Sequence, residues 1–198
     1  MMMDTMTVKP ADLLWPAGTA RLAIRPAVVE DLPRIFEYYR KPEVSEWLAS
    51  HPADLDAFIE LARQPELLAC IYVVERGDIH IGDLYMGIRD AWAQKEVQAQ
   101  AHATQAEIGY VIAPDYAGQG YANEAVAELL LICFEDLGLR RVTAECLAEN
   151  VASWRVMEKA GMRRETVTRQ ASLHRSGRWL DGYGYAVLAD EWRRSRVS

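Results

Sequence analysis

The stretch from Glu107 to Ala125, EIGYVIAPDYAGQGYANEA, decides the fold of this chain. Branched and aromatic residues between Glu107 and Ile112 predict a β-strand. Apolar residues recur at helical spacing between Tyr121 and Leu137, which predicts a long amphipathic helix. Gly118 and Gly120 lie in the turn that separates the two elements. The stretch therefore predicts a strand, a tight turn and a helix in direct succession.

The two glycines suggest an anion-binding turn. Without Cβ atoms, successive backbone N–H groups can point toward one place, and the dipole of the following helix adds positive potential there. A tight turn without a ligand explains the same spacing. Asn123 stands where a dinucleotide fingerprint has glycine, and no Gly-Lys-Ser/Thr follows as in a P-loop. From these residues alone, phosphate binding and a plain turn both stay open.

The pattern on either side of this stretch predicts an α+β fold with a mixed, mostly antiparallel sheet of about seven strands and about four helices. Strands joined through one helix should be parallel, and strands joined by hairpins antiparallel. Residues 1–19 are expected to form an arm, and residues 20–198 a single domain. The polar segment 91–104 is expected to be an exposed loop or a loose helix. The other predicted strands are 21–26, 67–75, 80–88, 141–146, 164–169 and 179–188, and the other predicted helices are 28–41, a segment after Pro52 and 151–160.

The composition excludes several classes of protein. The chain has 198 residues, of which 51% are hydrophobic and 26% charged, as in a soluble domain with a substantial core. Its apolar runs are far shorter than the roughly 20 residues that cross a bilayer. The N-terminus lacks the basic start and apolar segment of a secretory signal. We therefore expect a cytoplasmic protein that does not bind membranes.

Charge, histidine and cysteine usage narrow the chemistry further. A net charge of −7 argues against direct nucleic-acid binding. The four histidines are scattered without ligand-like spacing, so we expect no metal. Cys70, Cys133 and Cys146 each lie in an apolar run and are interpreted as buried, reduced thiols. The sequence leaves the oligomeric state open, a homodimer included.

Two motifs in this order resemble the GNAT acetyltransferase superfamily, and most closely its RimJ/RimL-like branch, which includes ribosomal-protein N-terminal acetyltransferases. The first reads Pro-x-x-x-Gly-Gln-Gly-Tyr-Ala-x-Glu-Ala over residues 114–125. The second combines Glu149-Asn150-x-x-Ser153 with Glu158-Lys159-x-Gly161-Met162. The resemblance covers about residues 20–192. It implies an N-acetyltransferase that uses acetyl-CoA as cosubstrate and acts on an amine acceptor.

The resemblance also implies which residues hold acetyl-CoA. Backbone amides of the turn are expected to bind the diphosphate, and the strand 107–112 is expected to diverge from the strand 141–146 so that the pantetheine arm enters between them. Main-chain groups near the end of the first strand would pair with that arm, and one N–H would polarise the thioester carbonyl. The implied cofactor-binding residues are Val111, Ile112, Ala113, Ala117, Gly118, Gln119, Gly120, Tyr121, Ala122, Asn150 and Ser153.

The sequence departs from the family pattern at two positions. Ala117 stands where the wider superfamily often has Gln or Arg, so one side-chain contact to phosphate is missing. Met157 replaces the tyrosine with which many relatives protonate the leaving thiolate. Ser153 is the candidate to donate to the sulfur, although a thiol with a pKa of about 8.5 can also leave with the help of water. The general acid stays open.

Glu107 is the candidate general base. An ammonium group has no lone pair with which to attack, and an α-amine with a pKa near 8 is only partly neutral at pH 7. Glu107 would take a proton directly or through water while the amine attacks the thioester, with no covalent enzyme intermediate. A strand-end carboxylate held in a salt bridge is the structural alternative.

The acceptor is less well defined by the sequence. In the segment 172–185, Trp179, Asp181 and Tyr183 are the candidate substrate residues, with aromatic walls and a carboxylate for an ammonium group. Aromatic residues on a terminal strand also commonly pack a core. A protein N-terminal α-amine is the first candidate acceptor. A small amine such as an aminoglycoside, polyamine or amino acid, and a non-catalytic acyl-CoA-binding domain, are the alternatives.

Overall fold

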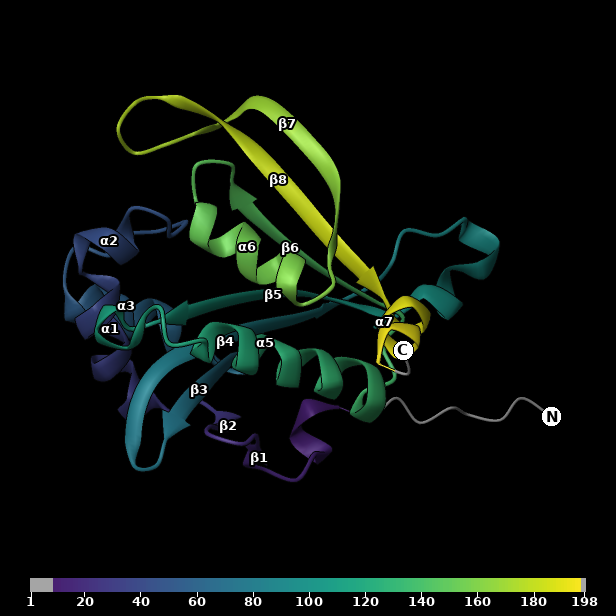
Figure 1. Ribbon diagram of the computed structural model, residues 1–198, viewed down its shortest axis with the longest axis horizontal. Coiled ribbons are helices and arrows are strands. Elements are labelled where there is room, and N and C mark those ends of the chain that lie inside the picture. Colours follow the sequence, from purple (N-terminus) through teal and green to yellow (C-terminus); the bar gives the residue numbers. More distant parts are fainter. Residues whose placement is uncertain (1–8, 197–198) are drawn as a thin grey trace.

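A mixed sheet of eight strands forms the centre of the molecule in the computed structural model, which describes residues 9–196 (Figure 1). The strand order is β1-β2-β3-β4-β5-β6-β8-β7. This confirms the predicted α+β class with a mostly antiparallel sheet. The strands are β1 (Ala17–Gly18), β2 (Ala23–Pro26), β3 (Ile71–Arg76), β4 (Ile79–Arg89), β5 (Gln105–Ile112), β6 (Arg141–Leu147), β7 (Arg163–Leu173) and β8 (Trp179–Leu188).

The strand β1 lies within the predicted arm, where the sequence pattern shows no period. It pairs with β2 over two residues, Ala17 opposite Ile24 and Gly18 opposite Ala23. A 3₁₀ turn at Pro10–Asp12 precedes it. The first eight residues of the arm lie outside the described residues. The sheet therefore gains its eighth strand from a segment too short to carry an alternating pattern.

Helices connect and cover the strands. Seven α-helices are present among the described residues, where the sequence predicts about four, and one of them replaces a segment that was predicted to be extended. The segment from Leu67 was predicted to be extended, but Pro65 begins a one-turn helix that ends at Leu68, and β3 begins only at Ile71. Proline suits the first helical position because its missing N–H has no partner there. The loop 91–104 contains a 3₁₀ segment, Lys95–Ala101. The α-helices are α1 (Leu32–Tyr39), α2 (Pro42–Ser45), α3 (Leu55–Ala62), α4 (Pro65–Leu68), α5 (Tyr121–Leu131), α6 (Val151–Lys159) and α7 (Ala189–Ser195).

The parallel pair β5 and β6 separates after a short contact. Only three residue pairs join them, from Gln105 opposite Arg141 to Glu107 opposite Thr143. Beyond that point β5 continues to Ile112 and β6 to Leu147 without pairing to each other. The predicted divergence of these strands is confirmed. A gap thus opens in the middle of the sheet, at the carboxyl ends of two strands whose remaining main-chain groups are available.

Two hydrophobic cores cover the two faces of the sheet, because side chains alternate along each strand. On one face Ala106 and Ile108 of β5 belong to a core that includes α5, α6 and α7. On the other face Ala113 packs with α1 and α3. In Figure 1, α5 and α6 lie across the front of the sheet, and α1, α2 and α3 gather at one end.

The helix α5 is fixed by one deeply buried stripe. Val126, Leu129 and Cys133 have no exposed surface, and each large apolar side chain contributes about 1.5–3 kcal/mol when fully buried. The predicted α-helix to Leu137 changes into a π-helical turn over Ile132–Asp136. That wider turn buries three consecutive residues, 132–134. Gly138 then ends the segment with φ of 65°, as predicted.

Residues 9–196 contain no helix that combines the length and the apolar character needed to cross a bilayer.

A buried carboxylate ties α1 to the sheet. Asp83 on β4 is 3% exposed and accepts hydrogen bonds from the hydroxyls of Tyr38 (2.6 Å) and Tyr39 (2.8 Å). Burial raises the pKa of Asp83 from 3.8 to about 6, although the two hydroxyls oppose the rise. The folded chain therefore binds this proton more tightly than the unfolded chain does.

This shift predicts a pH-dependent stability difference between the wild type and Asp83→Asn. Well below pH 3.8 Asp83 is neutral in the folded and unfolded chains alike. Between pH 3.8 and about 6 the unfolded chain has lost this proton and the folded chain still holds it, so the stability falls as the pH rises, by about 3 kcal/mol in total. Wild-type stability should therefore fall relative to Asp83→Asn between pH 4 and 7, as measured by urea unfolding. A difference independent of pH would contradict the raised pKa, and Asp115→Asn, an exposed carboxylate variant, is the control.

Candidate functional site

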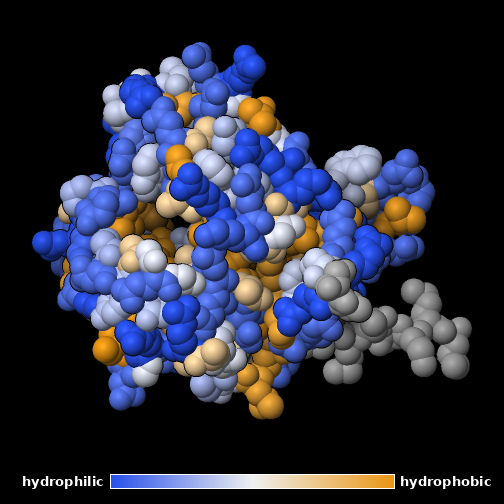
Figure 2. Space-filling view, viewed as in Figure 1, coloured by the Kyte–Doolittle hydropathy of each residue, from blue (hydrophilic) through white to orange (hydrophobic). Residues whose placement is uncertain are grey.

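A cavity of about 760 Å³ lies where the gap between β5 and β6 meets the beginnings of α5 and α6. Figure 2 shows its opening as a hollow with hydrophobic residues inside. The cavity is bounded by residues of both sheet faces, so it joins the α5 and α6 side to the α1 and α2 side. Its lining includes Tyr39, Trp47, Asp83, Tyr85, Glu107, Tyr110, Gly118, Gly120, Asn123, Asn150, Ser153, Arg155 and Lys159.

Six consecutive main-chain N–H groups, from Gly118 to Asn123, have no hydrogen-bond partner within residues 9–196. The first N–H groups of a helix have no acceptor in their own helix, and the N-cap of α5 is a glycine without a capping side chain. Gly118 and Gly120 have φ of 74° and 82°, the left-handed region that glycine adopts without strain. The turn therefore presents a row of free donors beside a helix N-terminus, which suits an anion.

Ala117, by contrast, has no free amide. Its N–H donates to the carbonyl of Pro114 at 3.0 Å and closes the 3₁₀ turn Pro114–Tyr116. The donors begin one residue later than the sequence suggested. Residue patterns do not reveal which N–H group closes a short turn, because a single turn has no periodic pattern in the sequence.

Arg21 places a positive charge beside the turn. Its guanidinium donates to the carbonyl of Gln119 (3.1 Å) and lies 4.5 Å from the ring centroid of Tyr121. Glu124 on α5 holds Arg21 at 2.6 Å. Sequence analysis missed this residue because nearly one hundred positions separate it from the turn.

The strand β5 directs alternate main-chain groups into the gap. Ala113 donates its N–H to Ile81 of β4 at 2.8 Å. Because hydrogen bonds alternate in direction along an antiparallel ladder, the register of Asp83 opposite Val111 turns the main chain of Val111 toward β4 as well. The main-chain groups of Ile112, and of Tyr110 before it, face the gap. Of the three predicted strand residues, Ile112 alone thus has its main chain on the open edge.

A hydrogen-bond cluster lies at the beginning of α6. Asn150 caps the helix, as predicted, because its side chain accepts from the N–H of Ser153 at 3.1 Å. The Ser153 hydroxyl is 3.1 Å from the hydroxyl of Tyr110, which also donates to the Ser153 carbonyl at 2.7 Å. Burial raises the pKa of Tyr110, so its hydroxyl stays protonated. Tyr110 was missed because one strand aromatic is indistinguishable from a core residue by sequence.

Glu107 borders the same cavity, and its carboxylate is paired with Arg89 at 2.7 Å. Its side chain is 36% exposed. Glu107 lies opposite Gly87 on β4, on the same face of β5 as Val111. Glu107 thus lines the cavity, as a general base would. It also forms a salt bridge, as expected if its role were structural.

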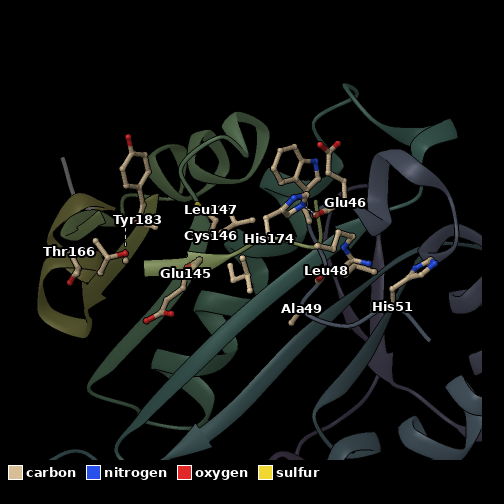
Figure 3. Close-up of a pocket in the computed structure, with 17 residues that line it drawn as sticks. Glu46, Leu48, Ala49, His51, Glu145, Cys146, Leu147, Thr166, His174 and Tyr183 are labelled. Carbon is tan, nitrogen blue, oxygen red and sulfur yellow. Dashed lines mark hydrogen bonds between the residues drawn. The ribbon is translucent and has the colours of Figure 1, made fainter. Parts of the chain in front are cut away.

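A second cavity, of about 640 Å³, adjoins the first between the β7–β8 hairpin and the segment after α2. In Figure 3, Glu46, Leu48, Ala49 and His51 come from one side, Thr166 and Tyr183 from the other, and β6 lies between them. The hairpin is tied to the segment by His174, whose Nε2 lies 3.0 Å from the Glu46 carbonyl. The residues shared by the two cavities are Trp47, Leu48, Ala49, Glu145, Cys146 and Leu147.

The three predicted substrate residues separate in the structure. Tyr183 lines the second cavity, with the guanidinium carbon of Arg164 3.9 Å from its ring centroid. Trp179 is 57% exposed at the beginning of β8 and lines neither cavity. Asp181 also lies outside both, and its carboxylate accepts from the N–H of Gln170 at 2.8 Å. The hairpin is twisted by bulges in β7, which an alternating sequence pattern does not reveal.

The cysteines correct one further expectation. All three are free thiols, but only Cys133 is buried, whereas Cys70 and Cys146 are partly exposed. Cys146 lines both cavities, and burial raises the pKa of its thiol to about 11. Within the described residues no group of three or more His, Cys, Asp or Glu is arranged to hold a metal ion.

Comparisons with known proteins agree with this geometry. The family model described as "Acetyltransferase (GNAT) domain" matches residues 21–163. The uncharacterized N-acetyltransferase YnaD of Bacillus subtilis is 43% identical over 86 residues, which span 43% of this chain and 50% of that protein. The uncharacterized N-acetyltransferase YoaA of the same species is 27% identical over 177 residues, or 86% of this chain and 94% of that protein.

The fold agrees as well. A GNAT-family acetyltransferase from Bacillus anthracis superposes with a TM-score of 0.73 at 28% identity, over 87% of this chain and 98% of that one. The free amides at the beginning of α5, the gap between β5 and β6 and the family match lead to one assignment. The chain belongs to the GNAT acetyltransferase family and is an N-acetyltransferase whose acetyl donor is acetyl-CoA.

Proposed function

We propose that this enzyme acetylates the N-terminal α-amine of a protein and belongs to the RimJ/RimL-like branch of its family. The observation that carries the proposal is the second cavity, which continues from the first along β6 and remains open to the surface. An amine in the first cavity would leave room for following residues of a peptide in the second. A single domain over residues 20–198, an arm over residues 1–19 and a cytoplasmic location stay predictions.

The described residues fit acetyl-CoA. The free amides of Gly118, Gln119, Gly120, Tyr121 and Ala122 suit its diphosphate, and the guanidinium of Arg21, which is paired with Glu124, lies beside them. Asn123 lines the cavity and its buried Oδ1 lacks a hydrogen-bond partner within residues 9–196. This oxygen would accept from an N–H or O–H group of the cofactor and not from the diphosphate. Ile112, Asn150 and Ser153 border the space for the pantetheine arm, whereas Val111, Ala113 and Ala117 would contribute by shape rather than by a free N–H. Bound acetyl-CoA supplies an electrophilic carbonyl and a thiolate leaving group.

The chain's own residues then perform three tasks. Glu107 takes a proton from the acceptor ammonium through water, which leaves the lone pair needed for attack. The N–H of Ile112 faces the gap and stabilises the oxyanion. The Ser153 hydroxyl, oriented by Tyr110, donates a proton toward the departing sulfur. No covalent enzyme intermediate is required.

A small cationic amine is the second candidate acceptor. The carboxylates of Glu43, Glu46 and Glu145 line the cavities and take part in no ion pair within residues 9–196. Unpaired carboxylates attract cations to a cleft. Basic protein tails and polyamines both meet this requirement, so the charge alone does not choose between them.

An acceptor panel tests the proposal. We expect thiol release from acetyl-CoA, and a mass increase on the α-amine, with peptides of four or more residues. Free amino acids, spermidine and an aminoglycoside should be turned over at least tenfold more slowly in kcat/KM. Peptides blocked at the N-terminus but containing lysine are the control. Faster turnover of a small amine than of any peptide would contradict the proposed acceptor.

The amide row predicts a specific effect of Gly118→Ala. An alanine at φ of 74° costs about 1–2 kcal/mol of stability and also disturbs the free donors. We expect CoA affinity, measured by calorimetry, to fall at least tenfold. Gly138→Ala is the matched control, because its φ of 65° gives the same strain with open space around the added methyl group. Equal losses of CoA affinity in both variants would mean that the amides do not bind the diphosphate.

The role of Glu107 predicts a pH-dependent loss. Glu107→Gln should lower kcat/KM for a peptide more at pH 6.5 than at pH 9, because the α-amine becomes neutral unaided as the pH rises. Steady-state rates over this range provide the test. Arg89→Gln, which removes the partner of the carboxylate but not the carboxylate, is the control. A loss of the same size at every pH would indicate a structural role.

A further inference from the structure

Asp83 is a carboxylate of the reaction cavity that the mechanism above does not use. It lies on β4, lines the cavity beside Tyr39 and Tyr85, and is 3% exposed. Charged carboxylates are seldom buried to this extent without a cationic partner. Within residues 9–196 its hydrogen-bond partners are two tyrosine hydroxyls, and no cationic side chain pairs with it. Anchoring α1 to the sheet would need only neutral hydrogen-bonding groups.

The sheet register places Asp83 next to the predicted reaction centre. Asp83 is directly opposite Val111, and paired side chains on one face have Cβ atoms about 4.5–5.5 Å apart. Glu107 lies four residues earlier on β5, about 13 Å along the strand at about 3.3 Å per residue. Its carboxylate is also engaged by Arg89. Asp83 is therefore better placed than Glu107 for a proton released where the C–N bond forms.

The hydrogen bonds of Asp83 leave it able to accept a proton. Tyr38 donates to Oδ1 and Tyr39 to Oδ2, so each carboxylate oxygen keeps a second lone pair. The Tyr38 hydroxyl is also 3.2 Å from Nε2 of His80. His80 is only partly buried, so the chain Asp83–Tyr38–His80 joins the cavity to the outside. Tyr39 has no such second contact among the described side chains.

The charged and titratable groups around the Asp83–Tyr38–His80 relay come from α1, the 3₁₀ turn Val29–Asp31 before it, β2, β4 and β5. Arg34 on α1, Asp31 before it and Arg25 on β2 act on His80. Tyr85 on β4 and Glu107 on β5 share the cavity with Asp83. Asp31 is neutralised by Arg25 at 2.7 Å, and Arg34 pairs with Glu37. None of these groups forms an ion pair with the Asp83 carboxylate.

We propose that Asp83 is a second general base, which takes the proton from the acceptor nitrogen as the C–N bond forms, and that Tyr38 and His80 pass this proton to solvent. The inference rests on the proposed acetyl transfer to an amine but not on which amine is used.

Acetylation of an ammonium group removes two protons from its nitrogen, and the proposal gives each of these protons an acceptor. An ammonium loses its first proton to Glu107 and becomes the amine that attacks. The attacking nitrogen, now bonded to the acetyl carbon, carries a positive charge and loses its second proton to Asp83. The C–S bond then breaks, and the thiolate takes a proton from Ser153 or water. Protonated Asp83 passes its proton through the Tyr38 hydroxyl to His80. His80 and Glu107 then each release one proton to water, and Ser153 takes one proton back from water. One proton is released overall for each amine acetylated, and all four groups regain their starting states.

The ionisation of Asp83 agrees with this role. With its pKa raised to about 6 by burial, Asp83 is ionised at neutral pH and becomes protonated just below it. A base works best when its pKa lies near the working pH. The hydrogen bonds of Tyr38 and Tyr39 hold the pKa down, so loss of either hydroxyl should raise it.

The first test measures Asp83 directly in the protein without ligand. An infrared pH titration should show the carbonyl stretch of one protonated carboxyl group appearing as the pH falls through about 6. Asp83→Asn should abolish that band, and Tyr39→Phe should move its midpoint to higher pH. The same band with an unchanged midpoint in Asp83→Asn would overturn the proposal. Because Tyr39→Phe retains the carboxylate, the test stands even where Asp83→Asn fails to fold.

The second test measures turnover with whichever amine the wild type uses, and acetyl-CoA hydrolysis, in which no ammonium titrates. Asp83→Asn should lower kcat on the order of 100-fold with KM for acetyl-CoA within threefold. In the pH profile of the hydrolysis rate, the fall on the acid side should occur at higher pH in Tyr39→Phe. The size of this pH shift should match the shift of the infrared midpoint. Tyr38→Phe should shift this fall too, and it should also slow turnover more than Tyr39→Phe, because it alone cuts the link to His80.

The outcomes separate the two proposals. Turnover of small amines in place of peptides overturns the proposed acceptor and leaves Asp83 to be tested on those amines. Retention of kcat within threefold in Asp83→Asn, with the fall on the acid side of the hydrolysis profile unshifted in Tyr39→Phe, overturns the role of Asp83 and leaves the acceptor assignment intact.

Discussion

The free main-chain amides at the beginning of α5 are the constraint on which the rest of the site depends. Most main-chain N–H groups of a folded protein have partners, yet the six from Gly118 to Asn123 have none within residues 9–196. The arrangement requires left-handed glycines in the turn and a helix that cannot shift. The fully buried side chains of Val126, Leu129 and Cys133 supply that rigidity. Packing on the far side of α5 thus keeps its first turn open to an anion.

The second organising feature is the separation of β5 from β6. Three pairs hold the strands together, and the residues beyond them line a passage through the sheet. Amides, Asn150 and Ser153 lie on the α5 and α6 side, whereas Asp83, Glu107 and the residues after α2 lie on the other. The donor and the acceptor can therefore approach from opposite faces. The two residues that we propose as proton acceptors, Asp83 and Glu107, are on the acceptor side, where an ammonium would arrive.

The elements that can be predicted from the sequence are those determined by neighbouring residues. The strand, glycine turn and helix around residues 107–137, the Asn150 cap and the Gly138 terminus follow from period and local chemistry, and all of them are present. The site residues that depend on long-range pairing do not follow. The direction of the Ile112 main chain, the contact of Tyr110 with Ser153 and the burial of Asp83 under α1 all need the register of neighbouring strands. The 3₁₀ turn that occupies the Ala117 amide needs the backbone geometry itself.

Amide chemical shifts of ¹⁵N-labelled protein titrated with CoA test the central claim most directly. The account predicts that the resonances of residues 118–123 shift most among the main-chain amides, and that the amide of Ala117, already bonded to Pro114, moves less. Saturable CoA binding by calorimetry, with the resonances of residues 118–123 unmoved and the large shifts elsewhere, would contradict it.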